Sequence, residues 1–460
     1  MDGIYQRAME LASILQDQDT VHIVTHIDAD GLTAGAIASS CVNRLGLPYT
    51  IEFIKQIDKN TTKNLEKHHG NLVWFTDLGS SIADEKTSFP KIITDHHVCE
   101  KTSDFSYHLN PHLFGVDGSY MISGAGLTYL VAKAVTTKNM DLSMLAVVGA
   151  VGDLQQRRHL QLVGLNQDIV KDGIKIGVVE EQKDVQYFGR ETRPVYKLLQ
   201  YASDPIIPGV SGLESNALSF LKDLSIPLKQ GKKWRRWIDL NHVERRVILS
   251  EIGQRLLAKG FGHQQVKRLI GNVYLLPKEV FGSELHDAKE YATLLNSTAR
   301  YGEYEIGLKV CLGDRKKALS SARSLLQGHR HNLVEGIQCA KTEGIHVRDY
   351  IQFFHAQKGI RDTIVGIVAN MLLNDVETRN DLPLIGFAEK NDEEIKASAR
   401  TTQDLVEKGL DLSKIIKHAA KTVDGVGGGH NIAAGATIPK GKEEEFLTAF
   451  ENEVKTQLSI

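Results

Sequence analysis

Three short hydrophobic segments near the start of the chain each run into acidic residues, and this pattern constrains the fold more than any other. The segments are IVTHIDADG (23–31), VWFTD (73–77) and IITDHH (92–97). Such segments are typical of strands buried on both faces of a parallel sheet. Because parallel strands share one carboxyl edge, where ligands of open α/β sheets bind, we expect the polar residues there to converge. These residues are His26, Asp28, Asp30, Asp77, Asp95, His96 and His97.

Carboxylates gathered in one place need a counter-charge, because like charges repel and raise one another's pKa. A pair of divalent metal ions would supply it. Oxygen and imidazole ligands without thiolates suit Mn²⁺ or Mg²⁺ better than a structural zinc ion. Asp77 could bridge two ions, and Asp153 could complete the site from the end of a helix predicted for LAVVGAVGDL (145–154). Two ions of this kind activate a water and hold a phosphoryl group, while His97 could protonate or orient the leaving group.

Each motif has a structural explanation when it is taken alone. A D-x-D-G segment is a common surface turn, and an Asp after a strand often caps a helix or forms a turn. The chain combines H-I-D-A-D-G, a strand ending in Asp, a strand ending in D-H-H and a later G-D, in this order. We infer that this combination indicates a metal site.

The order of hydrophobic patterns divides the chain into three predicted parts. Residues 1–195 alternate strand and helix patterns, which predicts an α/β domain with a doubly wound, mainly parallel sheet. Residues 196–338 form a linker and a helical insert, beginning with the Pro- and Gly-containing YASDPIIPGVSGLES (201–215). Residues 339–460 form a second α/β domain, for which GIVANMLL (366–373) and LPLIGFAEK (382–390) are predicted strands.

Composition excludes several other classes of protein. The chain has 460 residues, 42% hydrophobic and 24% charged, with a net charge of −2. We expect no membrane span, because no run of ~20 hydrophobic residues occurs. The amphipathic first helix is not a secretory signal, and the four scattered cysteines form no C-x-x-C pair, so we expect a reducing, cytoplasmic location. With this net charge, binding of nucleic acid would need a local basic surface.

A second candidate site lies in the C-terminal part. The segment GVGGGH (425–430) contains Gly428, Gly429 and His430, and glycine backbone can approach an anion closely. Upstream, Ser398 and Arg400 supply a hydroxyl group and a planar guanidinium, which suits phosphate. A glycine run is also often only a flexible loop, so its role depends on these partners.

Basic residues elsewhere are candidates for contacts with nucleic acid. KKWRRW (232–237) interleaves cations with aromatic rings that could stack on bases; a solvated helix face with tryptophan packed beneath it explains the segment equally well. Arg157 and Arg158 follow Asp153 and are expected near the metal edge, unless they are a plain surface pair. Arg361, in FFHAQKGIRDT (353–363), could face the substrate or could flank a buried helix.

At this point the motifs resemble a known family. H-I-D-A-D-G, F-T-D, T-D-H-H and V-G-D, in this order, are similar to the four motifs of the DHH phosphoesterase superfamily, and G-G-G-H with the upstream S-x-R resembles its associated C-terminal domain. The combination is most similar to archaeal RecJ-like single-strand exonucleases. The resemblance implies catalytic roles for His97 and Asp77 and two Mn²⁺ ions, with Mg²⁺ as the alternative. It implies as metal ligands His26, Asp28, Asp30, Asp77, His96 and Asp153.

The resemblance also implies a function. The chain would be a metal-dependent hydrolase that degrades single-stranded DNA, and RNA as a further candidate, in DNA replication or repair. Ser398, Arg400, Gly428, Gly429 and His430 would bind the substrate's phosphates, and the GINS replication complex is an implied partner. Two alternatives stay open: a phosphoesterase for oligoribonucleotides or cyclic dinucleotides, and a non-catalytic replication scaffold. The long middle insert favours a polymeric substrate, and the complete set of motif acids favours activity.

Overall fold

The computed structural model describes residues 2–57, 59–68, 70–98, 107–373 and 378–458. The chain divides into two compact units, Met1–Leu325 and Leu326–Ile460. Both are α/β, with a parallel sheet in the first and a mixed sheet in the second, which confirms the predicted fold class. Among the described residues, no helix is long and apolar enough to cross a membrane.

The first unit is built on a five-stranded sheet in the order β2-β1-β3-β4-β5, and every neighbouring pair of strands is parallel. Three of these strands are the hydrophobic segments that the sequence predicts. β3 and β4 are buried along their whole length, as expected for a sheet covered on both faces. The strands are β1 Val21–His26, β2 Tyr49–Ile54, β3 Leu72–Thr76, β4 Lys91–Thr94 and β5 His108–Leu109.

Helices with many small residues pack on this sheet. α2 is almost completely buried, and a Cβ atom at Gly35 would lie only 2.9 Å from the Thr25 side chain of β1, so glycine permits the close approach. α5 ends at Gly152 with Asp153 as its C-cap, which confirms the predicted helix. The helices are α1 Asp2–Gln16, α2 Ala29–Arg44, α3 Lys59–Leu65, α4 Gly124–Val135, α5 Ser143–Gly152 and α6 Leu165–Lys175.

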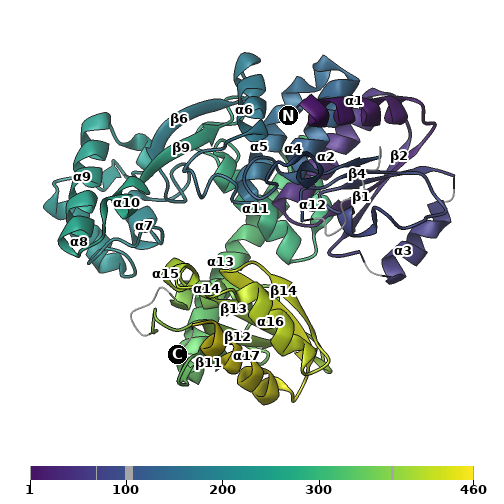
Figure 1. Ribbon diagram of the computed structural model, residues 1–460. Helices are drawn as coiled ribbons and strands as arrows, with labels where there is room; N and C mark the ends of the chain where they lie inside the picture. The colour runs from purple at the N-terminus through teal and green to yellow at the C-terminus, as the bar shows by residue number, and fades with distance from the viewer. Residues whose placement is uncertain (1, 58, 69, 99–106, 374–377, 459–460) are drawn as a thin grey trace. The chain divides into compact units, whose positions relative to one another are not determined.

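A two-stranded antiparallel ribbon, β6 and β9, leads to a lobe with its own hydrophobic core (Figure 1). Trp237, Phe220 and Ile248 are buried in this core. The elements are β6 Glu180–Val185, α7 Val195–Gln200, α8 Glu214–Asp223, β7 Lys229–Gln230, β8 Lys233–Trp234, α9 His242–Ala258, α10 His263–Lys267 and β9 Ile270–Leu275.

The KKWRRW segment of this lobe is not a helix face. Trp234 lies on β8 and is 38% exposed, whereas Trp237 is fully buried. Arg235 forms an ion pair with Glu244, and Arg236 forms one with Asp239. Both guanidinium groups are therefore already engaged within the lobe.

Three further helices follow the lobe. α11 Ala288–Arg300 lies within the predicted helical insert, and α12 Tyr304–Cys311 comes next. α13 Lys317–Glu343 contains the boundary between the two units.

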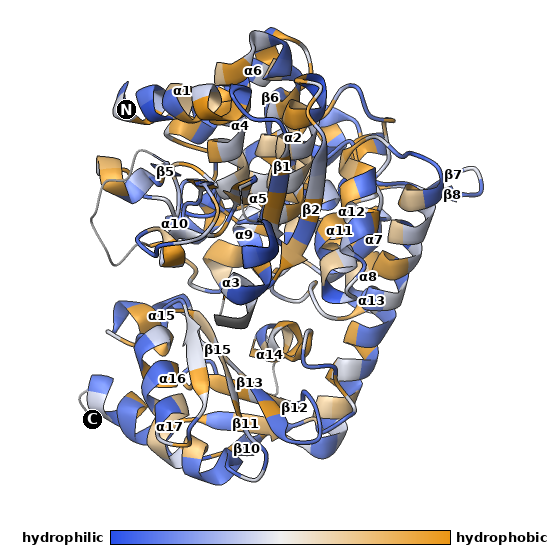
Figure 2. Cartoon of the chain, turned by 90° about the vertical axis from the view of Figure 1, so that its right-hand side faces the viewer, coloured by the Kyte–Doolittle hydropathy of each residue, from blue (hydrophilic) through white to orange (hydrophobic). Residues whose placement is uncertain are grey.

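The second unit contains a six-stranded sheet in the order β10-β11-β12-β13-β15-β14. β11 and β12 are parallel, and the other pairs are antiparallel. Hydrophilic and hydrophobic residues alternate along α16 and α17, which bury their apolar sides in the unit's core (Figure 2). The strands are β10 His346–Val347, β11 Gln352–His355, β12 Leu384–Glu389, β13 Glu394–Arg400, β14 Val426–Gly429 and β15 Ala433–Pro439. The helices are α14 Val365–Leu373, α15 Gln403–Glu407, α16 Leu412–Lys421 and α17 Glu443–Gln457.

One local prediction in this unit is wrong. GIVANMLL is the helix α14, in which Val365, Val368 and Leu372 are buried at helical spacing. Short apolar runs do not distinguish a strand from a buried helix by periodicity alone, which explains the error. The start of FFHAQKGIRDT is the buried strand β11, and Arg361 lies just before the buried helix α14, in agreement with one of the two interpretations of this segment.

Candidate metal centre

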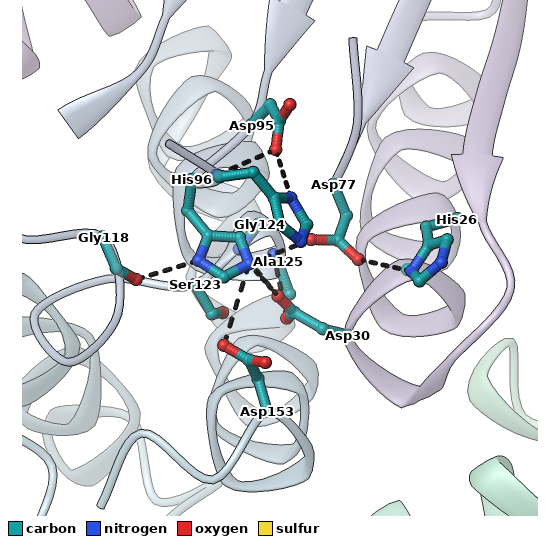
Figure 3. A network of polar contacts seen from close by, with 12 residues as sticks. His26, Asp30, Asp77, Asp95, His96, Gly118, Ser123, Gly124, Ala125 and Asp153 are labelled. Atoms are coloured by element: carbon teal, nitrogen blue, oxygen red, sulfur yellow. Dashed lines mark hydrogen bonds and ion pairs between the residues drawn. The ribbon is translucent and has the colours of Figure 1, made fainter. Parts of the chain in front are cut away.

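The predicted acidic and histidine residues meet at the carboxyl edge of the parallel sheet, where their side chains point toward one another (Figure 3). His26 ends β1, Asp28 caps α2 by accepting a hydrogen bond from the Gly31 amide at 3.0 Å, and Asp30 lies in the first turn of α2. Asp77 directly follows β3. The D-x-D-G motif thus forms the turn from a strand into a helix.

Asp77 is the central residue of this arrangement. It is 1% exposed and has a φ of 61°, a left-handed conformation that is strained in residues other than glycine. Its two carboxylate oxygens face different partners: Oδ2 lies 3.4 Å from His26 Nδ1, and Oδ1 lies 3.3 Å from His96 Nε2. Burial alone would raise the pKa of Asp77, but the imidazole rings of His26 and His96 hold it below its ordinary range.

A backbone carbonyl orients His96. Its Nδ1 lies 2.8 Å from the Gly118 carbonyl oxygen, so Nδ1–H donates and Nε2 presents its lone pair to the centre. Besides Asp77, that nitrogen faces Asp153 Oδ2 at 3.7 Å and Asp30 Oδ2 at 3.8 Å. His96 therefore joins the third and fourth motifs to the first.

Asp30 accepts hydrogen bonds from two amides at the start of α4, those of Gly124 at 2.7 Å and Ala125 at 3.1 Å. The positive end of a helix dipole stabilises a carboxylate. Burial and the neighbouring Asp77 nevertheless raise the pKa of Asp30 well above its ordinary value. A bound cation would supply a counter-charge that stabilises the carboxylate of Asp30.

His97 differs from His96, because its side chain is 55% exposed, although one of its ring nitrogens lies within 4.8 Å of donor atoms of Asp77 and His96. Asp95 holds it: the Asp95 Oδ1 atom accepts from His97 Nδ1 at 2.8 Å and from the His97 amide at 3.1 Å. Burial would lower the pKa of His97, but the Asp95 carboxylate raises it to about 9. The Asp95 carboxylate is itself fixed by the Ser80 amide.

The residues at this edge fit divalent metal ions. Three sets of donor atoms each lie within 4.8 Å of one another: His26, Asp28 and Asp77; Asp77, His96 and His97; and Asp30, His96 and Asp153. Within the described residues, Asp77 Oδ1 and His26 Nδ1 are buried without a hydrogen-bond partner, as expected of metal ligands. Oxygen and imidazole donors in this ratio suit Mn²⁺ or Mg²⁺.

Residues outside the predicted set also shape this centre. Asn296 of α11 accepts a hydrogen bond from the Ala29 amide at 3.0 Å, which secures the start of α2. Arg300 lies close enough to Asp28 to interact electrostatically, although burial lowers its pKa. Two glycines also have no room for a side chain, because a Cβ atom would lie 2.3 Å from Asp77 at Gly124 and 2.4 Å from Asp30 at Gly149.

Arg157 and Arg158 follow Asp153 in the turn after α5. The Arg157 side chain is 53% exposed and lies 3.8 Å from Asp204, and the Arg158 guanidinium lies over the Tyr120 ring at 5.1 Å. Both are therefore exposed on the same unit as the centre.

In the second unit, the predicted phosphate-binding residues lie on β13 and at the end of β14, two strands that flank β15. We call them the phosphate row: Ser398, Arg400, Gly428, Gly429 and His430. Ser398 of β13 and Gly428 of β14 both pair with Gly435 of β15. Ser398 is buried, whereas Gly428, Gly429 and His430 are exposed. Gly429 has a φ of 141°, a backbone conformation that favours glycine.

Arg400 is the last residue of β13 and lies against α14. A Cβ atom at Gly366 would lie 2.4 Å from Arg400 Nη2 and 3.2 Å from Ser398 Oγ, so the glycine lets the helix approach both. Burial lowers the pKa of Arg400, and its Nη1 donates to the Ala399 carbonyl at 2.7 Å. Arg361 is exposed just before this helix. Gly366 is not among the predicted site residues, because the pattern of its segment predicts a strand and not the helix α14.

Comparisons with known proteins identify the class. The family model of the DHH-CID domain matches residues 187–270, and that of the DHHA1 domain matches residues 347–456. The chain therefore carries two domains of the DHH superfamily, and its fold is like that of RecJ. More narrowly, it belongs to one family with the uncharacterized protein MJ0831 of Methanocaldococcus jannaschii. The two are 31% identical over 454 residues, which cover 97% of this chain and 95% of that protein.

Solved structures share the fold. RecJ from Thermus thermophilus, solved in complex with Mn²⁺, matches with a TM-score of 0.61 and 17% identity over 99% of this chain and 55% of that chain. CDC45 from Entamoeba histolytica matches with a TM-score of 0.65 and 13% identity, covering 99% of this chain and 97% of that chain. The chain thus spans only about half the length of the Thermus RecJ.

Proposed function

We propose that the protein is a phosphodiesterase dependent on two divalent metal ions, with Mn²⁺ as the expected ion and Mg²⁺ as the alternative. The observation that carries the proposal is the position of Asp77, which belongs to two of the donor sets and directs one oxygen toward each. A carboxylate in this position would bridge the ions. His26 and Asp28 would complete one ligand set, and His96, Asp30 and Asp153 the other.

When bound, a pair of ions supplies an activated water and stabilises charge on the phosphoryl oxygens. The chain's residues contribute the rest. His97, which carries a proton at neutral pH because Asp95 raises its pKa to about 9, would donate that proton to the leaving oxygen. Asp95 is a positioning residue that fixes the ring through Nδ1 and leaves Nε2 to act.

The row in the second unit would bind substrate phosphates. Arg400 offers a planar guanidinium, the exposed amides of Gly428 and Gly429 can approach an anion, and Ser398 and His430 add donors. Arg157, Arg158 and Arg361 are further candidates for contacts with the nucleic-acid backbone, because basic side chains neutralise phosphate charge.

For the substrate we propose single-stranded DNA, with RNA as a second candidate, degraded from one end in DNA replication or repair in the cytoplasm. The likeness to RecJ over almost the whole chain and the match to the DHH-CID domain support a polymeric substrate. The likeness to CDC45 supports a partner in a replication complex, and GINS is the proposed one.

The test is a gel time course with Mn²⁺ on single strands of DNA and RNA, labelled at either end. The variant Asp77→Ala removes the shared carboxylate, and EDTA removes the ions. Asp141→Ala is the matched control, because this exposed aspartate pairs with Arg44 outside the centre. We expect progressive shortening by wild type and Asp141→Ala, and none by Asp77→Ala or with EDTA.

Other outcomes separate the alternatives. Equal turnover of dinucleotides and long strands would favour a phosphoesterase for small substrates. Metal-dependent GINS binding without cleavage of any substrate would favour a scaffold. An Asp77→Ala variant with more than about a tenth of wild-type activity would refute the bridging assignment. Removal of a group that stabilises the transition state lowers kcat by at least this factor.

A further inference from the structure

A second cluster of metal-ligating side chains lies on the same sheet, away from the centre described above. His22 is the second residue of β1, Glu52 lies on β2, and His68 ends the short helix Glu66–His68. One donor atom from each lies within 4.8 Å of the other two. Because His22 precedes His26 by four residues, it lies ~13 Å from the carboxyl edge along the strand.

The register of the strands explains how the cluster forms. His22 pairs with Thr50, and Glu52 is two residues further along β2. The side chains of His22 and Glu52 therefore share one face of the sheet. The His68 ring stacks on the His22 ring with centroids 3.6 Å apart and an angle of 13° between their planes. This places two imidazoles and a carboxylate side by side.

The buried nitrogen of His22 lacks a hydrogen-bond partner. His22 is 5% exposed, and its Nε2 has no hydrogen bond within the described residues, although Glu52 Oε2 lies 3.6 Å away. The other nitrogen, Nδ1, lies 2.7 Å from Thr50 Oγ1, so donation from Nδ1 to this hydroxyl leaves a lone pair on Nε2. His68 Nε2 is also buried without a hydrogen bond.

Charge at the cluster favours a cation. Burial and the neighbouring His68 lower the pKa of His22 to about 4, so its ring is neutral, as a metal ligand must be. Glu52 carries the negative charge, and its Oε2 atom, besides facing His22, lies 3.9 Å from Nζ of the 62% exposed Lys67. This lysine can move into solvent when a metal ion takes its place.

We propose that His22, Glu52 and His68 form a separate site for a transition-metal ion of the zinc class. Two imidazoles and one carboxylate suit Zn²⁺, Co²⁺ or Ni²⁺ better than Mg²⁺, and three protein ligands leave one position for water. Lone pairs on parallel rings do not converge, so ion binding would tilt the half-buried His68 ring away from its stacked position. The site would brace β1, β2 and the segment before β3 against one another.

The experiment compares metal content and affinity in full-length variants. Apo protein is loaded with Zn²⁺ alone, desalted and analysed for zinc per chain, and Co²⁺ titrations are followed by visible absorption. The variants are His22→Phe and Glu52→Gln, with His418→Phe as the control that removes an exposed imidazole on α16. The double variant Asp28→Ala/Asp77→Ala isolates the site from the first centre.

We expect His22→Phe to retain one zinc ion fewer than wild type and His418→Phe to retain the same number. Glu52→Gln should weaken Co²⁺ binding by about 100-fold, because loss of a ligand costs at least as much as loss of a residue that orients one. The double variant should keep the His22-dependent ion.

Unchanged zinc content in His22→Phe, or unchanged Co²⁺ affinity in Glu52→Gln, would overturn the proposal. If His22→Phe does not fold, the Co²⁺ affinity of Glu52→Gln tests the proposal by itself. This substitution keeps the size of a partly exposed side chain, so we expect the variant to fold.

Discussion

Gly124 lets the start of α4 pass directly beside Asp77, and the substitution Gly124→Ala tests whether the position of Asp77 controls activity. A Cβ atom at residue 124 would lie 2.3 Å from Asp77 Oδ1, 2.6 Å from its Cβ and 2.7 Å from its Cα. The last two atoms belong to a buried, left-handed residue and cannot rotate away. The added methyl group must therefore displace Asp77 or the start of α4.

The size of the effect follows from these contacts. Ordinary contacts begin near 3.4 Å, so residue 124 and the Cβ of Asp77 must separate by about 1 Å. Overpacking of this kind costs about 1–3 kcal/mol, and replacement of glycine by alanine in a helix returns about 0.5–1 kcal/mol. The net loss of about 0–2.5 kcal/mol lowers Tm by at most about 10 °C. A misplacement of about 1 Å in an active site, in contrast, reduces the rate by about 100-fold.

The assay measures kcat/KM on a labelled single strand with Mn²⁺, together with Tm. Gly253→Ala in α9 is the matched control, because its Cβ would meet only Val266 Cγ1, at 3.6 Å. We expect it to leave activity unchanged and Tm equal or higher. A folded Gly124→Ala variant with activity within about twofold of wild type would refute the reasoning, since an overlap of this size cannot relax without moving Asp77 or the α4 amides that hold Asp30.

Three further predictions concern the positioning residue, the phosphate row and the ions. Asp95→Asn should lower kcat by at least about 100-fold, the usual contribution of a general acid, while bound manganese, measured by elemental analysis, stays unchanged. Arg400→Ala should raise KM for a single strand by at least about tenfold, because one charged hydrogen bond to the substrate is lost, while kcat and metal content are retained. Loss of manganese in this variant would show that Arg400 supports the metal centre instead of binding phosphate. EDTA should lower Tm by several degrees, because ions present at 100 times their Kd stabilise the fold by ~2.7 kcal/mol. An unchanged Tm would argue against metal binding by the buried carboxylates of Asp30 and Asp77.

The strands and motifs of the first unit could be predicted because each signal is local. Hydrophobic runs followed by acids gave β1, β3 and β4, and parallel pairing then required their carboxyl ends to meet. The position of Asp153 at the end of α5 came from the same kind of local pattern. Their convergence was therefore an inference from topology that the structure bears out.

Local patterns failed where one run of residues suits two structures. The apolar segment 366–373 contains enough hydrophobic residues for a buried strand, yet it folds as a helix whose Gly366 lies against Arg400 and Ser398. Trp237 shows the same limit, because a tryptophan next to a run of basic residues has the same pattern whether it stacks on a base or fills a core. In both cases the deciding contacts come from residues distant in the sequence.

The contribution of α11 to the metal centre shows what a single sequence leaves hidden. Ala292, Asn296 and Arg300 are spaced by four, so they form one row along the helix. That row runs along the centre: a Cβ at Gly152 would lie 3.2 Å from Ala292, Asn296 accepts from the Ala29 amide, and Arg300 interacts with Asp28. The amphipathic pattern identifies the buried face of α11 but not what that face covers. Because Asn296 and Ala29 are 267 residues apart, only the fold relates them, and a helix outside the four motifs thereby holds the first motif in place.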